Sequence, residues 1–235
     1  MKYTTRYYYF LGILSAICLM WILLITSIEA VCYWTPGYFE KEYTKYQVLN
    51  DLPQMSMDDL LDVTGEMMDY LRGTREDLHV TTTMGGVERE FFNEREIAHM
   101  EDVRGLFLRA ISLRRIALGF ILATMFLLVI WKAPLRKILP RCICIGSGIF
   151  LAVVGVLAAI ISTDFTKYFV IFHHIFFDND LWILNPATDM LINIVPEGFF
   201  MDTAVRIGAL YAILVALILG VSIALIIKGR THGQE

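Results

Sequence analysis

The sequence predicts an all-α membrane protein with four transmembrane helices and a small extracytoplasmic α+β cap. Of its 235 residues, 57% are hydrophobic and only 19% are charged, whereas about a quarter of the residues of a soluble domain are charged. Four stretches are long and apolar enough to cross the hydrocarbon core, which takes roughly 20 residues of helix. We place these spans at residues 7–30, 111–131, 143–161 and 207–227.

Two of the spans need a comment. The second begins with Arg114 and Arg115, whose long side chains can extend toward the headgroups while their stems stay in an apolar environment. The first resembles a signal peptide in its position, but it is longer than the roughly 7–15 apolar residues of a signal sequence. We therefore interpret it as an uncleaved membrane anchor.

Lysine and arginine flank the spans on one side, and this bias predicts the orientation of the chain. Basic residues precede the first span, fill the short connection 132–142 and follow the fourth span: Lys2, Arg6, Lys132, Arg136, Lys137, Arg141, Lys228 and Arg230. The sequence therefore predicts that both termini and this turn are cytoplasmic. The segments 31–110 and 162–206 are then extracytoplasmic.

The first outer segment, 31–110, predicts the α+β cap. Hydrophobic residues three and four positions apart predict a helix that Ser56 caps and Gly73 ends. β-branched residues around Gly85 and Gly86 predict a short hairpin. A second helix then leads into the second span.

A candidate catalytic group lies on this second helix. Glu96, His99 and Asp102 follow one another at spacings of three and so share one face of the helix. A carboxylate beside a histidine can accept its ring N–H, fix the tautomer and raise the basicity of the ring, as a general base requires. The plainer interpretation is a solvated acidic helix face in which the histidine is incidental.

The second outer segment, 162–206, brings two further histidines. The stretch FHHIFFDNDLWILNP contains His173 and His174 among aromatic residues, which are frequent at the membrane interface, where a histidine can serve only as an anchor. If both outer segments reach the same depth, their histidines can form a pair that neither segment supplies alone. His79 and His232 are interpreted as surface residues.

Several kinds of chemistry lack their sequence signals. The chain has no Gly-x-Ser-x-Gly elbow, phosphate-binding glycine loop, His-Glu-x-x-His or Cys-x-x-Cys motif. Cys142 and Cys144 fall short of the four ligands of a structural zinc site, so we expect no metal and no other cofactor. No basic patch indicates nucleic-acid binding.

The blocks FFNEREIAHMEDV and FHHIFFDNDLWILNPATDMLINIVPEGFF resemble the two signatures of a bacterial four-span membrane family, the lipoprotein intramolecular transacylases. The resemblance covers span order, cap and both blocks. It implies that one fatty acid moves from the glycerol sn-2 ester of a diacylglyceryl lipoprotein to the α-amine of its N-terminal cysteine, leaving a lyso-form lipoprotein. The expected partners are diacylglyceryl-modified lipoproteins and membrane lipid, at the outer face of the bacterial cytoplasmic membrane.

Our hypothesis gives the two histidines separate roles. His99, oriented by Asp102 or Glu96, is the general base, and His173 stabilises the oxyanion and protonates the leaving oxygen; the roles can be exchanged. His173 matches the family motif better than His174 does. The remaining motif positions are expected to shape the site or bind the substrate: His174, Asn179, Asp180, Trp182 and Asn185.

Three alternatives remain at this point. Cys32 is the one outer thiol in the sequence and could carry a covalent acyl intermediate. His99, His173 and His174 with an outer aspartate could instead bind a catalytic metal in a membrane hydrolase. The third alternative is a non-enzymatic protein that binds a partner or assists assembly, which would need neither a reactive thiol nor a metal.

Overall fold

The computed structural model describes residues 2–52 and 54–231, which form eight α-helices, one 3-10 helix and a two-stranded sheet. They fall into two compact units, and three of the four long helices have residues in both. Unit 1 comprises residues 1–28, 111–165 and 207–235, and unit 2 comprises 29–110 and 166–206. His232 lies outside the described residues.

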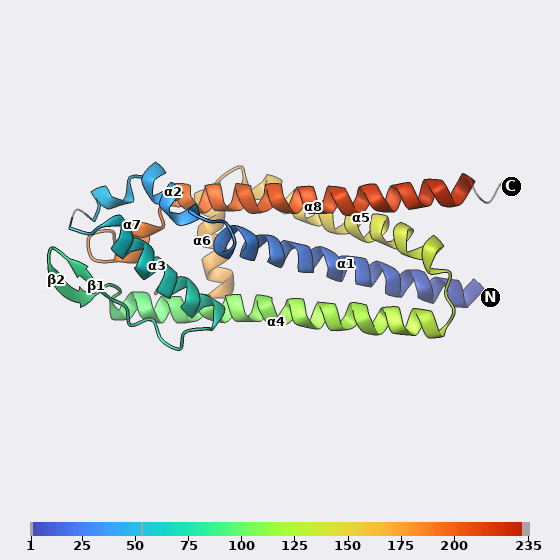
Figure 1. Cartoon of the computed structure of the whole chain (residues 1–235), viewed down its shortest axis with the longest axis horizontal. Coiled ribbons are helices and arrows are strands. Elements are labelled where there is room, and N and C mark those ends of the chain that lie inside the picture. The colour runs from blue at the N-terminus through green and yellow to red at the C-terminus, as the bar shows by residue number, and fades with distance from the viewer. Residues whose placement is uncertain (1, 53, 232–235) are drawn as a thin grey trace. The chain divides into compact units, whose positions relative to one another are not determined.

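Four helices are long and apolar enough to cross a membrane. They are α1 (Lys2–Tyr33), α4 (Glu94–Ile130), α5 (Leu135–Ile161) and α8 (Glu197–Thr231). We take the parts of these helices that belong to unit 1 as the membrane-spanning segments. The first turns of α1, the last turns of α8 and the α4–α5 connection lie at one end of unit 1 (Figure 1), as four successive spans require.

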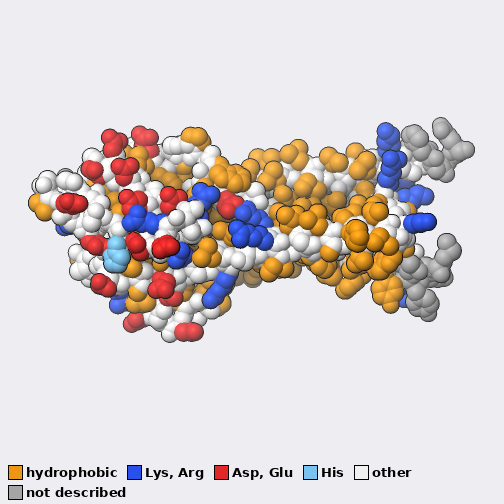
Figure 2. Space-filling view, turned by 60° about the horizontal axis from the view of Figure 1, so that its bottom comes forward, with side chains coloured by type: hydrophobic (Ala, Val, Ile, Leu, Met, Phe, Trp, Pro, Cys, Tyr) orange, Lys and Arg blue, Asp and Glu red, His pale blue; other side chains and the backbone are white. Residues whose placement is uncertain are grey.

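The surface of unit 1 fits a lipid environment. Aliphatic and aromatic side chains cover the face shown in Figure 2, and many are more than half exposed, including Ile116, Leu122 and Phe126 on α4 and Leu217 on α8. Such a contiguous apolar surface is unfavourable in water and favourable against acyl chains. The expected multi-pass membrane protein is therefore supported by both helix length and surface.

Small residues let α1 and α5 approach closely. A Cβ added at Gly146 would lie 2.6 Å from Ala16 Cβ and 3.0 Å from the carbonyl oxygen of Ile13, and one added at Gly12 would lie 2.6 Å from Cys142 Sγ. Gly12 and Ala16 are one turn apart on α1, as Cys142 and Gly146 are on α5. This is the small-xxx-small arrangement by which membrane helices pack when water provides no driving force between them.

Unit 2 contains the predicted hairpin and helices, together with three short helices that the sequence analysis did not anticipate. The additional elements are α2 (Tyr38–Lys45), η1 (Val48–Asn50) and α7 (Met190–Ile194), and the others are α3 (Met57–Arg72), β1 (Thr81–Met84), β2 (Val87–Glu90) and α6 (Phe165–Phe176). Ser56 caps α3 by accepting the Asp59 N–H, and Gly73 ends the helix with a left-handed conformation. The expected helix, the two residues that cap its ends and the expected hairpin are thus confirmed.

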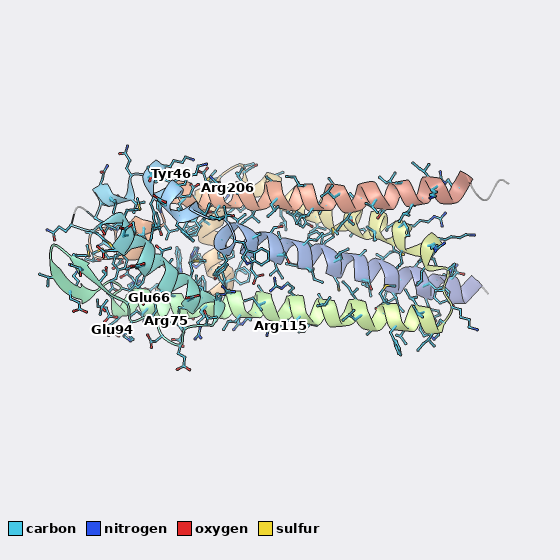
Figure 3. All side chains as sticks on the ribbon, viewed as in Figure 1. Tyr46, Glu66, Arg75, Glu94, Arg115 and Arg206 are labelled. Carbon is cyan, nitrogen blue, oxygen red and sulfur yellow. The ribbon has the colours of Figure 1, made fainter. Side chains whose placement is uncertain are left out.

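The start of α8 is bound to α2 within unit 2. Tyr46 donates to the Gly198 carbonyl at 2.8 Å, and a side chain at Gly198 would collide with the Tyr46 ring. Arg206 donates to the fully buried Glu42 at 2.8 Å; Figure 3 labels Tyr46 and Arg206, which lie near one another on these two elements. These contacts hold the Pro-Glu-Gly-Phe-Phe stretch in place beside the first outer segment.

The connection between the second and third spans is shorter than expected. α5 begins at Leu135, so Arg136, Lys137 and Arg141 belong to its first turns and not to a turn over 132–142. Pro140 is also helical. It is the sixth residue of α5, so its missing N–H leaves the Arg136 carbonyl without its usual helical donor.

The α1–α5 contact yields a stability prediction. Gly146→Ala should destabilise the protein by about 1–3 kcal/mol, because the new methyl group meets a backbone carbonyl that cannot move away easily. Gly148→Ala on the same helix is the matched control, since its Cβ would meet nothing within 4 Å. Thermal unfolding in detergent should show a lower midpoint for the first variant only; equal midpoints would contradict the close approach.

Candidate active site

The first turn of α4 is fixed by a buried carboxylate. Asn93 and Glu96 form a reciprocal capping box: the Glu96 N–H donates to Asn93 Oδ1 at 3.0 Å, and the Asn93 N–H donates to Glu96 Oε2 at 2.8 Å. The other oxygen, Oε1, accepts the N–H of Leu191 on α7 at 2.6 Å. Glu96 is fully buried, and its bond to Leu191 joins α4 to the segment 162–206.

His99 follows one turn later on α4, before the membrane-spanning part of that helix. It is buried, and its Nδ1 has no hydrogen-bond partner among the described residues. The edge of its ring faces Phe177, with the centroids 5.5 Å apart. Burial, and next the nearby His173, lower the pKa of His99 to about 4. The ring is therefore neutral at physiological pH.

His173 lies near the end of α6 and has a defined tautomer. Its Nδ1 is 2.7 Å from the carbonyl oxygen of Phe169, one turn earlier. A carbonyl can only accept, so Nδ1 carries the hydrogen and, in the neutral ring, Nε2 keeps a free lone pair. Burial lowers the pKa of His173 as well, which keeps Nε2 available as a base.

Aromatic side chains enclose His173. Trp182 stacks on the imidazole with centroids 4.7 Å apart, and Phe169 lies at 4.3 Å. His173 is only 6% exposed, although most of its neighbours on α6 are exposed. A ring held on several sides by other rings keeps one orientation, as a proton-transferring group requires.

The two histidines meet within unit 2. The His99 and His173 ring centroids are 6.2 Å apart, with an angle of 34° between the ring planes. The structure therefore brings together the pair that the sequence analysis proposed from two separate segments. Because neither ring is charged at neutral pH, the pair does not suffer mutual repulsion.

The loop after α6 is attached to the same face of α4. Asn179 Nδ2 donates to Asp102 Oδ2 at 2.8 Å, and the Asn179 carbonyl accepts Trp182 Nε1 at 3.1 Å. Asp180 forms an ion pair with Arg95, whose guanidinium also donates to the Asp180 carbonyl. Asn179 thus fixes the tryptophan that stacks on His173, and Arg95 is a contributor that the sequence analysis did not single out.

Other expected site residues have different positions. His174 is exposed and meets Trp182 edge-on at 5.3 Å. Asn185 organises a turn: its N–H donates to Asp189 Oδ2 at 2.6 Å and its Oδ1 accepts the Ala187 N–H at 3.0 Å. Asp189 in turn accepts Asn93 Nδ2 at 2.9 Å. Asn185 therefore acts on the site through the loop that carries it.

We expected a carboxylate to orient His99, but no carboxylate forms a hydrogen bond with its Nδ1. Glu96 uses both of its oxygens for backbone N–H groups, and Asp102 accepts from Asn179. A backbone N–H at a helix start or in a buried turn costs more free energy without an acceptor than a neutral imidazole does. The role of Asn93 could have been predicted from the sequence, since Asn-x-x-Glu at a helix start is a capping pattern.

A catalytic metal, the second alternative, would require at least three donor side chains close together. Within residues 2–52 and 54–231, no three His, Cys, Asp or Glu side chains are grouped so that they could hold a metal ion.

Comparison with known proteins gives the family. The family model described as lipoprotein intramolecular transacylase Lit matches residues 13–200. The chain belongs to this family. Three solved structures of Lit from Bacillus cereus have a similar fold: two histidine-substituted variants superpose with TM-scores of 0.76 and 0.77, each at 19% identity over 98% of this chain and 97–98% of theirs.

A more similar sequence is known over a shorter length. A protein of Aquifex aeolicus (strain VF5), described as uncharacterized, is 29% identical over 132 residues, which is 55% of this chain and 53% of that protein. The match thus spans about half the length of this relative.

The buried, neutral His99 predicts a pH dependence of stability. An unfolded histidine titrates near 6.5, so between about pH 6.5 and 4 the unfolded chain binds a proton that the folded chain does not. As the pH falls through this range, His99 should lower the free energy of unfolding by on the order of 3 kcal/mol; this loss should be absent above about pH 6.5 and complete only below about pH 4.

Chemical unfolding in detergent at pH 7 and pH 4.5 measures this effect. The difference between the two values should shrink in His99→Gln and change little in His79→Gln, since His79, two residues before β1, is exposed and its ion pair with Glu90 lies at the surface. An undiminished difference in His99→Gln would show that His99 is not buried in its neutral form.

Proposed function

We propose that this protein transfers an acyl chain from the glycerol sn-2 ester of a diacylglyceryl lipoprotein to the α-amine of the lipoprotein's N-terminal cysteine. Membership of the Lit family supports the class of reaction. The observation that carries the proposal is the pair of neutral imidazoles 6.2 Å apart, one of which has its Nε2 lone pair free.

His173 acts as the base in this proposal. The amine nitrogen attacks the ester carbonyl, and Nε2 of His173 takes the proton that the nitrogen loses as the C–N bond forms. The resulting imidazolium returns this proton to the glycerol oxygen as the C–O bond breaks. The products are an amide on the cysteine and a free glycerol hydroxyl, and His173 is neutral again.

His99 stabilises the negative charge of the intermediate. A neutral imidazole carries one N–H, and in a dry site a fixed donor aimed at an oxyanion contributes several kcal/mol to lowering the barrier. With Nδ1 of His99 unused by the protein, the ring is available to the substrate. This reverses our initial hypothesis for the two histidines, because the bond from His173 to Phe169 favours His173 as the base.

The reaction needs no acyl-enzyme intermediate. Donor ester and acceptor amine belong to one molecule, and well-oriented intramolecular reactions gain about 7–11 kcal/mol from proximity. The thiol of Cys32 is a poor nucleophile here, since burial raises its pKa to about 11 and keeps it protonated. A covalent route through Cys32 is therefore disfavoured.

We further propose that unit 2 lies on the outer face of the bacterial cytoplasmic membrane, with both termini inside. The clustering of Lys and Arg at one end of unit 1 supports this orientation (Figure 2). The exposed apolar residues of α6 support contact of the site with lipid: Val170, Ile171, Phe172, Ile175 and Phe176. An acyl chain held in the membrane could then reach His173 without leaving an apolar environment.

Histidine substitutions test the enzyme assignment. His99→Ala and His173→Ala should each reduce formation of the N-acyl lyso product by about 100-fold or more, since a general base alone contributes that factor. Mass spectrometry of N-terminal peptides from a diacylglyceryl lipoprotein incubated with each purified variant measures it. His79→Ala is the control and should keep full activity; normal turnover in both site variants would point to a binding protein.

Glutamine variants separate the two roles. A glutamine can donate a hydrogen bond to an oxyanion but cannot accept a proton at neutral pH. His99→Gln should therefore retain more activity than His99→Ala, by about tenfold within the range known for oxyanion donors, whereas His173→Gln should be as inactive as His173→Ala. The opposite ranking would assign the base to His99.

A further inference from the structure

A groove between α5 and α8 lies at the end of unit 1 that holds the first turns of α1 and the last turns of α8. Its volume is about 510 Å³, which is within the range of small-ligand sites. It extends along α5 from Leu135 to Ile143 and along α8 from Leu217 to Leu225. At 1.5 Å per residue, each wall is about 12 Å long. The two helices diverge toward this end in Figure 1.

The walls of the groove are hydrocarbon, with one charged side chain among them. Leucine, isoleucine and valine make up most of the lining, and Arg136 lies on the first turn of α5 beside them. Pro140 also lines the groove; it has no N–H and so removes the usual helical donor to the Arg136 carbonyl. The groove therefore offers an apolar slot beside a cation.

The charge around this end is one-sided. Lys132, Lys137 and Arg141 share the start of α5 or the turn before it, and Arg230 lies near the end of α8. Residues 131–161 and 207–231 contain no Asp or Glu, so no nearby carboxylate of these segments neutralises them. Figure 2 shows basic side chains gathered at this end of unit 1. A bound molecule with an apolar chain and an anionic head would complement both features.

We propose that this groove binds an anionic phospholipid, with one acyl chain between α5 and α8 and the phosphate at Arg136. A neutral or zwitterionic lipid would fill the same slot but would gain less from Arg136. An anionic headgroup gains about 1 kcal/mol for each basic residue close to it. The site is separate from the histidine pair, which belongs to unit 2, and the proposal does not depend on the reaction.

Native mass spectrometry of the delipidated protein tests the proposal. With added phosphatidylglycerol or phosphatidylcholine of the same chains, the protein should retain phosphatidylglycerol preferentially. Arg136→Gln should weaken phosphatidylglycerol binding by about fivefold, the factor equivalent to roughly 1 kcal/mol, and leave phosphatidylcholine binding unchanged. Arg141→Gln, the matched charge change outside the groove lining, should have a smaller effect.

Filling the groove provides a second variant. Val221→Phe places a ring within the lining and should reduce binding of both lipids while the thermal midpoint without lipid is kept, because Val221 is 62% exposed. Equal binding of the two lipids by the unmodified protein, or equal effects of Arg136→Gln and Arg141→Gln, would overturn the proposal. So would dimers that Val221→Phe abolishes, because the groove would then be an interface between copies of the chain.

Discussion

The arrangement of unit 2 depends on the buried carboxylate of Glu96. A carboxylate without partners costs several kcal/mol in an apolar interior, and here its two oxygens accept the backbone N–H groups of Asn93 and Leu191. Those bonds set the first turn of α4 and join it to α7, which are 95 residues apart. His99 lies one turn further along the same face, so its position against α6 follows from a bond that contains no catalytic group.

The histidine pair shows why an aromatic setting suits proton transfer. Rings around His173 exclude water and lower the pKa, while the bond from Nδ1 to the Phe169 carbonyl offsets part of that effect by favouring the protonated ring. The result is a base that is neutral at rest and can hold a proton briefly. His99 lacks such a bond, and its pKa is about 4. The two imidazoles therefore differ in their hydrogen bonding, and the proposed division of roles between base and neutral donor rests on this difference.

Much of this could be predicted from sequence, because the strongest signals are local. Apolar length predicted the four membrane helices, Ser56 and Gly73 predicted the ends of α3, and Gly85-Gly86 predicted the hairpin. The short α2 and α7 carry too few residues for a periodic pattern, and tertiary bonds such as Arg206 to Glu42 hold α2 in place. The sequence predicted the carboxylates beside His99 but not their hydrogen-bond partners. Helix periodicity places Asp102 on the correct face of α4, but it cannot show that Asn179, 77 residues away, donates to it.

One helix of unit 1 combines close packing with an open groove, and its sequence explains both. Gly146 and Cys142 allow α5 to approach α1, where Ala16 and Gly12 face them. Pro140 precedes Cys142 by about half a turn and Gly146 by about 1.7 turns, and the segment before it has long aliphatic residues and Arg136 in place of small ones. Bulky side chains hold helices apart where small ones let them meet. A membrane protein cannot leave such a space to water, so lipid is the solvent that must fill it, and the charge at Arg136 then selects among lipids.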